Sequence, residues 1–124
     1  MEKKIKITAG NVAAQALLND SPTAQKIWEA LPIEAKGDTW GDEIYFGIPI
    51  KAPLEKSAKE VVEVGDLGFW PPGHAFCIFF GPTPVSRGSE VRPASAVNVV
   101  GRVEGDARVF KKVPSGAKVK IEKE

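Results

Sequence analysis

Alternation of apolar and polar residues marks the start of the chain. At residues 4–7 the order Lys-Ile-Lys-Ile puts every second side chain on the same face, which is the pattern of a half-buried strand. A turn at Gly10 follows, and we expect residues 11–18 to return as the partner of this strand. The pattern therefore predicts that the chain begins with a β-hairpin.

The next segment has helical periodicity. Ser21 is a suitable N-cap, Pro22 fits the first helical position, and Pro32 would end the helix. Between them, apolar side chains recur at intervals of three and four residues, at Ala24, Ile27, Trp28 and Leu31. A helix of this length with one apolar stripe is expected to pack on, or plug, a larger structure.

The rest of the chain is predicted to consist mainly of short strands separated by turns. The expected strands cover residues 34–39, 43–46, 61–64, 67–70, 75–80, 97–100 and 117–121. Residues 106–113 could hold a second short helix, and Gly101 is expected at a bulge. About eight short strands in 124 residues favour one mainly β domain over residues 1–124, folded as a closed barrel or a sandwich.

Alternation also predicts which side chains share a face. In the apolar run 75–80, Phe76, Ile78 and Phe80 lie on one side, and Cys77 and Phe79 lie on the other. In residues 43–46, the apolar pair Ile44 and Phe46 alternates with Glu43 and Tyr45. If the apolar pair fills the barrel, Glu43 and Tyr45 face outward, where a groove could receive them.

Composition narrows the classes of function. The chain has 17 basic and 16 acidic residues, interspersed, and this balance argues against a nucleic-acid partner. It contains neither an apolar run long enough to cross a membrane nor a secretory leader, so we expect a cytoplasmic protein without a membrane partner. Lys and Glu are common while Cys and Met each occur once, a bias that predicts a thermophilic source.

The counts of cysteine and histidine exclude several kinds of site. Cys77 is the only cysteine, which rules out an internal disulfide and a multi-cysteine zinc site. His74 is the only histidine, so a pair of histidine ligands cannot form. We therefore expect no metal and no cofactor.

Motifs in three places resemble those of cyclophilins. Ser-Pro-Thr-Ala at residues 21–24 resembles the Ala-Pro-x-Thr segment that opens the first cyclophilin helix. Val-Val-Gly-Arg-Val-Glu-Gly at residues 99–105 and Val-Phe-Lys-Lys-Val at residues 109–113 resemble the cyclophilin strand that leads through Glu-Gly to a short helix. Phe-Phe at residues 79–80 is placed like the Phe-Phe of a cyclophilin strand. These matches imply the cyclophilin type of barrel.

The chain is also similar to a small family of cyclophilin-like proteins from archaea and thermophilic bacteria. The similarity rests on Trp-Gly-Asp-Glu-Ile-Tyr-Phe at residues 40–46 and on the Gly-Asp-x-Gly-Phe-Trp-Pro-Pro-Gly and Ile-Phe-Phe-Gly-Pro-Thr-Pro motifs within residues 65–84. It covers nearly the whole chain. This similarity implies a closed eight-stranded barrel with one or two short helices. It does not indicate an activity.

The isomerase residues of cyclophilins are not matched. The Phe-His-Arg triplet of the enzymes has no counterpart, and the first arginine of the chain is Arg87. Val97 stands where the enzymes place a histidine, Arg92 stands where they place a tryptophan, and Ile78 replaces the glutamine of Gln-Phe-Phe. These departures put prolyl isomerisation in doubt while leaving a binding groove possible.

The leading hypothesis is a barrel that binds a peptide or small molecule in a surface groove. The residues expected to line this groove are Trp40, Glu43, Tyr45, Trp70, His74 and Arg92. A rival hypothesis is a weak prolyl isomerase or a small-molecule enzyme that transfers protons through Glu43 or His74. A third is a homodimer formed by self-pairing of the aromatic strand at residues 75–80. Two simpler alternatives to these hypotheses stay open. The aromatic residues could all belong to the core, and Glu43 could be an ordinary glutamate exposed to solvent.

Overall fold

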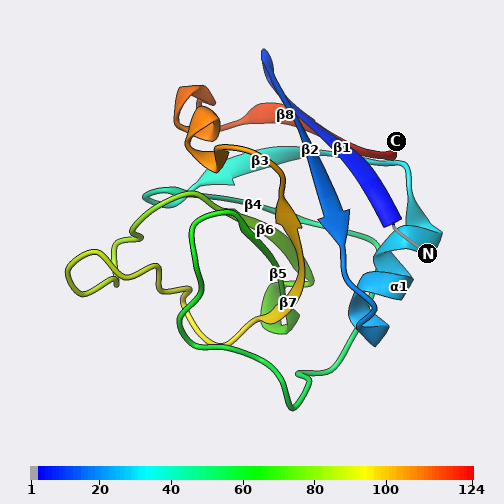
Figure 1. The fold of residues 1–124 in the computed structure, drawn as a ribbon, viewed down its shortest axis with the longest axis horizontal. Helices are drawn as coiled ribbons and strands as arrows, with labels where there is room; N and C mark the ends of the chain where they lie inside the picture. The colour runs from blue at the N-terminus through cyan, green and yellow to red at the C-terminus, as the bar shows by residue number, and fades with distance from the viewer. Residues whose placement is uncertain (1–2) are drawn as a thin grey trace.

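The computed structural model describes residues 3–124, and eight strands within this range form one closed barrel (Figure 1). The order around the barrel is β1-β2-β7-β5-β6-β4-β3-β8, and antiparallel pairing of β1 with β8 closes it. The strands are β1 (Lys3–Ala9), β2 (Val12–Leu18), β3 (Ile33–Thr39), β4 (Glu43–Gly47), β5 (Asp66–Trp70), β6 (Ala75–Phe79), β7 (Asn98–Val103) and β8 (Ala117–Lys123). The prediction of a closed, mainly β barrel is confirmed.

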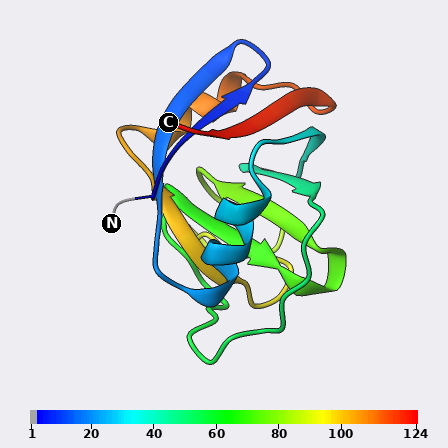
Figure 2. The ribbon, with the colours of Figure 1, turned by 90° about the vertical axis from the view of Figure 1, so that its right-hand side faces the viewer.

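Helix α1 (Pro22–Ala30) lies against the barrel, as the turned view in Figure 2 shows. The Ser21 hydroxyl caps it by accepting a hydrogen bond from the Ala24 amide at 3.2 Å. Ala24 and Ile27 are fully buried and join the core inside the barrel. Trp28 is half-buried, with Lys123 Nζ 4.7 Å from its ring centroid. The amphipathic segment therefore closes over the barrel interior, as its pattern predicted.

The expected alternation of faces is confirmed along β6. Phe76, Ile78 and Phe80 belong to the core inside the barrel, where the rings of Phe76 and Phe46 stack at 5.5 Å. The side chains between them belong to a second buried group on the outside of the sheet. We call this group the outer cluster, and it consists of Val62, Ala75, Cys77, Phe79, Val91 and Val97. The side chains of one strand thus pack into two separate apolar clusters, one on each face of the sheet.

The predicted strand at residues 61–64 is wrong. Val62 makes only an isolated bridge to Val91, and Lys59 makes another to Val97. Both bridges lie outside the barrel strands, because the segment between β4 and β5 crosses over the outer face and covers part of the outer cluster. Of the three valines in this segment, only Val62 is buried in the outer cluster, whereas Val61 and Val64 are exposed.

The pairing of β5 with β7 is irregular beside two glycines, Gly68 and Gly101. Opposite β7, Leu67 pairs with Gly101 and Gly68 pairs with Val99, which leaves Val100 as the extra residue of a bulge beside the predicted position. A Cβ on Gly101 would lie 2.3 Å from the Leu17 carbonyl oxygen, so this close approach requires glycine.

Two short 3-10 helices complete the described part of the fold. They are η1 (Pro71–Gly73) and η2 (Ala107–Lys112), and the second is the short helix expected at residues 106–113. Capping of η2 comes from Asp106, which accepts a hydrogen bond from the Arg108 amide at 3.0 Å.

Strand β6 is paired along both edges, with β4 on one side and β5 on the other. Its residues Ala75–Phe79 are all buried. Self-pairing of this strand with a second copy is therefore not available, because neither edge is open. A homodimer stays a prediction that would need another surface.

Candidate functional site

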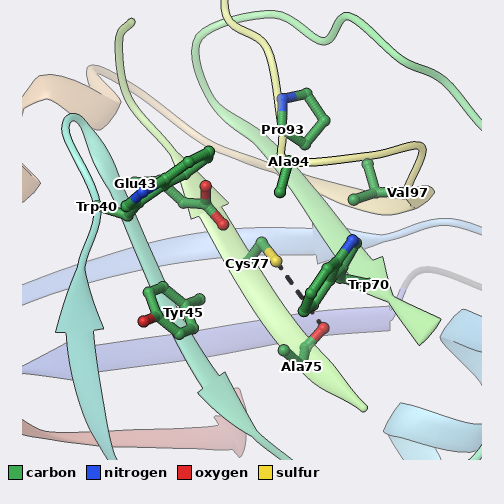
Figure 3. A pocket seen from close by; sticks show the side chains of 9 residues that line it. All are labelled: Trp40, Glu43, Tyr45, Trp70, Ala75, Cys77, Pro93, Ala94 and Val97. Carbon is green, nitrogen blue, oxygen red and sulfur yellow. Dashed lines mark hydrogen bonds between the residues drawn. The ribbon is translucent and has the colours of Figure 1, made fainter. Parts of the chain in front are cut away.

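A pocket of about 300 Å³ opens on the outside of the barrel, over the outer cluster (Figure 3). Aromatic and small apolar side chains form most of its lining, and one carboxyl group faces it. The lining residues are Trp40, Glu43, Tyr45, Trp70, Ala75, Cys77, Pro93, Ala94 and Val97. Four of the six residues expected to share a groove are therefore brought together here, namely Trp40, Glu43, Tyr45 and Trp70.

Strand β4 places Glu43 and Tyr45 in the pocket through its alternation. Ile44 and Phe46 point into the barrel, so the residues on either side of Ile44 point outward. In the ladder with β6, Glu43 lies opposite Phe79 and Tyr45 lies opposite Cys77. Glu43 is buried, whereas Tyr45 is 37% exposed at the pocket edge.

The two tryptophans reach the pocket from turns at the ends of strands. Trp40 lies in the corner between β3 and β4, where its amide donates to the Glu43 carbonyl at 2.9 Å. Trp70 ends β5, and its Nε1 donates to the Ser95 hydroxyl at 2.7 Å. Figure 3 shows the two indole rings on opposite sides of Glu43 and Cys77. Both rings are half-buried, so each presents surface to a ligand.

The segment at residues 81–97 forms the remaining wall, and internal hydrogen bonds hold it in place. The Ser86 hydroxyl accepts from the Thr83 amide at 2.8 Å and from the Arg92 amide at 3.1 Å. The Thr83 hydroxyl donates to the Arg92 carbonyl. These contacts set the position of Pro93 and Ala94, which follow directly in the chain and line the pocket.

Glu43 is the unusual group of this site. Its side chain is 5% exposed, and its Oε1 atom has no hydrogen-bond partner within residues 3–124. Burial raises the pKa of the Glu43 carboxyl from about 4.5 to about 7, and the adjacent Cys77 thiol opposes part of this rise. Near neutral pH the carboxyl therefore exchanges between its charged and neutral forms.

Cys77 is not suited to be a nucleophile. Burial, the nearby Glu43 charge and the interaction with that carboxyl all raise the pKa of the Cys77 thiol. The reactive form of cysteine is the thiolate, which these effects disfavour. Cys77 is therefore a buried, unreactive thiol, and its side chain also lines the pocket.

His74 and Arg92 lie outside the lining of this pocket. His74 follows η1 in a left-handed conformation (φ 48°), and its side chain is exposed. The Arg92 guanidinium is engaged by Glu90, with Nε 2.7 Å from Oε1. The sequence predicted that both residues line the groove. The left-handed turn at His74 and the ion pair between Arg92 and Glu90 instead hold their side chains outside the pocket lining.

The sequence interpretation missed several lining residues. Cys77 and Val97 could have been found, because Cys77 shares its face of β6 with Phe79 and Val97 adjoins the strand that pairs with β5. Pro93 and Ala94 have no such pattern, since their place depends on the fold of the preceding loop.

Residues 3–124 contain neither a cluster of metal-binding side chains nor a helix that could span a membrane. Over this range, no group of three or more His, Cys, Asp or Glu side chains is arranged to hold a metal ion. None of the helices described there is long and apolar enough to cross a membrane.

Comparisons with known proteins agree with this architecture. The family model for cyclophilin-like proteins matches residues 3–122. The chain is similar to a hypothetical protein from Archaeoglobus fulgidus with a known solution structure, at 38% sequence identity and a TM-score of 0.83. The match covers 99% of this chain and 95% of the archaeal one. A search of curated proteins gives no match. On the barrel topology, the matched family model and this structural relative, the chain belongs to the cyclophilin-like family.

Proposed function

We propose that this protein binds a small molecule, or one side chain of a peptide, non-covalently in the pocket over the outer cluster. The observation that carries the proposal is the pair of half-buried rings, Trp40 and Trp70, flanking the buried carboxyl of Glu43. Large apolar walls with a few convergent polar groups are typical of ligand sites.

The volume of the pocket limits the size of the bound group. Its 300 Å³ is at the lower end of the range for small-molecule sites. At ~30 Å³ per water in the liquid, this space corresponds to about ten water molecules. A ligand, or the part of a peptide that enters the pocket, should therefore have about ten non-hydrogen atoms.

Tryptophan fluorescence tests the proposal, because the chain has three tryptophans and only two of them line the pocket. We would titrate the protein with proline-containing dipeptides and with single-ring aromatic compounds. Saturable changes in emission are expected, and they should shrink in Trp40→Phe and in Trp70→Phe. Trp28→Phe is the matched control, since Trp28 lies on α1, and its response should equal that of the wild type. An unchanging signal for every probe, in the wild type and all three variants, would contradict the proposal.

A second candidate function is weak prolyl isomerisation, which one observation favours. The protonated form of Glu43 could donate a hydrogen bond to the prolyl amide nitrogen and so stabilise the twisted amide. This activity should be stronger at pH 6 than at pH 8, because the acid form is lost as the pH rises. A protease-coupled assay with a proline peptide measures it. An unaccelerated rate at micromolar protein at both pH values would exclude the isomerase.

A further inference from the structure

We infer that the ligand of this pocket carries an organic ammonium group on a small apolar body. The inference rests on the proposed binding function and names the class of ligand. It follows from three features of the described residues: the aromatic walls, the buried Glu43 carboxyl, and the way in which neighbouring charges are already paired.

The walls of the pocket favour a cation. Trp40, Tyr45 and Trp70 all contribute lining, and Figure 3 places the two indoles on either side of the space next to Glu43. The face of an aromatic ring carries partial negative charge, so a cation within about 6 Å of its centre is attracted. Trp is the strongest of the aromatic side chains in this respect.

The Glu43 carboxyl selects for a group that donates hydrogen bonds. Its two oxygens accept hydrogen bonds when ionised, and Oε1 is unsatisfied by any partner in the described chain. Leaving such a buried atom without a donor is unfavourable, and an ammonium N–H supplies both the donor and the opposite charge. A ligand carboxylate would instead place two like charges together.

Charged groups on the surrounding elements do not supply this partner. Asp42, next to Glu43, pairs with Lys111 of η2 at 3.7 Å. On the segment that forms the far wall, Arg92 pairs with Glu90 at 2.7 Å. Strand β6 contributes only the Cys77 thiol, whose raised pKa keeps it neutral. Tyr45 brings a phenol from β4 itself. The positive charge that would pair with Glu43 is thus left for the ligand to bring.

Ammonium binding should be coupled to ionisation of Glu43. A cation binds the charged carboxylate and not the neutral acid, so binding releases a proton whenever the acid form is populated. With a pKa of about 7, Glu43 is about one-tenth ionised at pH 6 and about nine-tenths ionised at pH 8. The affinity for a cation should therefore rise about tenfold between these pH values.

A matched set of three probes tests the charge preference. They are 2-phenylethylammonium, 2-phenylethanol and phenylacetate, which share an aromatic ring and differ in charge. The amine stays protonated from pH 6 to pH 8, because alkylamines titrate near pH 10. Binding is measured by calorimetry and by tryptophan emission at both pH values. The variants are Glu43→Gln and, as a control, Glu29→Gln, which changes an exposed glutamate on α1.

The expected result is preferential binding of the cation. At pH 8 the ammonium probe should bind the wild type about tenfold more tightly than the alcohol, and Glu43→Gln should abolish this difference and its pH dependence. Glu29→Gln should behave as the wild type. Equal binding of all three probes, or tighter binding of phenylacetate, would overturn the ammonium inference while leaving the pocket as a binding site. Absence of any saturable signal from the probes and from the dipeptides would instead overturn the proposed binding function.

Discussion

The two faces of strand β6 pack against different surroundings. Phe76 and Ile78 point into the barrel, where they belong to the apolar core. Ala75, Cys77 and Phe79 point outward, where a carboxyl group and two tryptophans adjoin the outer cluster. Alternation along one strand thus separates a surface that stabilises the fold from a surface that offers a binding pocket. Substitutions on the two faces should accordingly have different consequences.

The largest effect is expected on the inner face. Phe76→Ala removes a fully buried ring that stacks on Phe46, and loss of such a ring costs ~3–5 kcal/mol of unfolding free energy. Urea denaturation at one fixed pH measures this loss. Its neighbour on the outer face provides the comparison, because Cys77→Ala removes only a sulfur atom and should cost about 1 kcal/mol. Equal losses for the two variants would contradict the assignment of faces.

Glu43→Gln should give the next largest effect, and it should be stabilising at high pH. The pKa of Glu43 is about 7 in the folded protein against about 4.5 for an exposed glutamate. Stability from the protonated carboxyl is fully present below about pH 4.5 and is lost as the pH rises through about 7. At pH 8 the glutamine variant should exceed the wild type by about 3 kcal/mol, and near pH 4 the two should agree.

Urea denaturation of both proteins from pH 4 to pH 8 measures that difference. The wild-type curve contains the titration of every other carboxylate, so the quantity of interest is the gap between the two curves. Glu29→Gln serves as the control and should follow the wild type throughout. A gap that stays constant with pH would contradict a raised pKa for Glu43.

Trp70→Phe should have a smaller effect on stability and a clear effect on binding. The variant loses the hydrogen bond from Nε1 to the Ser95 hydroxyl, which contributes about 1 kcal/mol. Without this hydrogen bond, the ring at position 70 is no longer held in place as a wall of the pocket. The affinity for 2-phenylethylammonium should therefore fall several-fold. Calorimetry checks the affinity and thermal melting checks the stability. A large loss of stability with unchanged affinity would place Trp70 in the core rather than in the site.

The smallest effect is expected at His74. Its side chain is exposed and outside the pocket, and its left-handed backbone is a conformation that glycine adopts readily. His74→Gly should therefore change the unfolding free energy by less than ~0.5 kcal/mol and leave ligand affinity unchanged. Loss of binding in this variant would restore His74 as a candidate functional residue.

Apart from Trp40 and Trp70, which lie at or beside turns, the part of the site that the sequence could predict is the part carried by strand β4. Glu43 and Tyr45 were expected to face outward because Ile44 and Phe46 alternate with them, and the structure agrees. Strand periodicity holds for such residues because the pleat sets the direction of each side chain.

Residues placed by turns and loops could not be predicted in this way. His74 depends on the backbone conformation that follows η1, and Pro93 depends on hydrogen bonds made through Ser86. The mistaken strand at residues 61–64 has a similar cause, since Val62 is buried in the outer cluster through a loop that does not join the barrel. Periodicity shows that a residue is covered, but it does not show which element covers it.

The titration of the Glu43 side chain is the most direct test of this account. Carbon-13 NMR of the carboxyl group, assigned by comparison with Glu43→Gln, would follow its ionisation in the free protein. A midpoint near pH 7 is the result that the buried environment of Glu43 predicts. A midpoint near 4.5 is the value of an exposed glutamate. That result would contradict the claim that Glu43 is a buried carboxyl available to bind a ligand in the pocket.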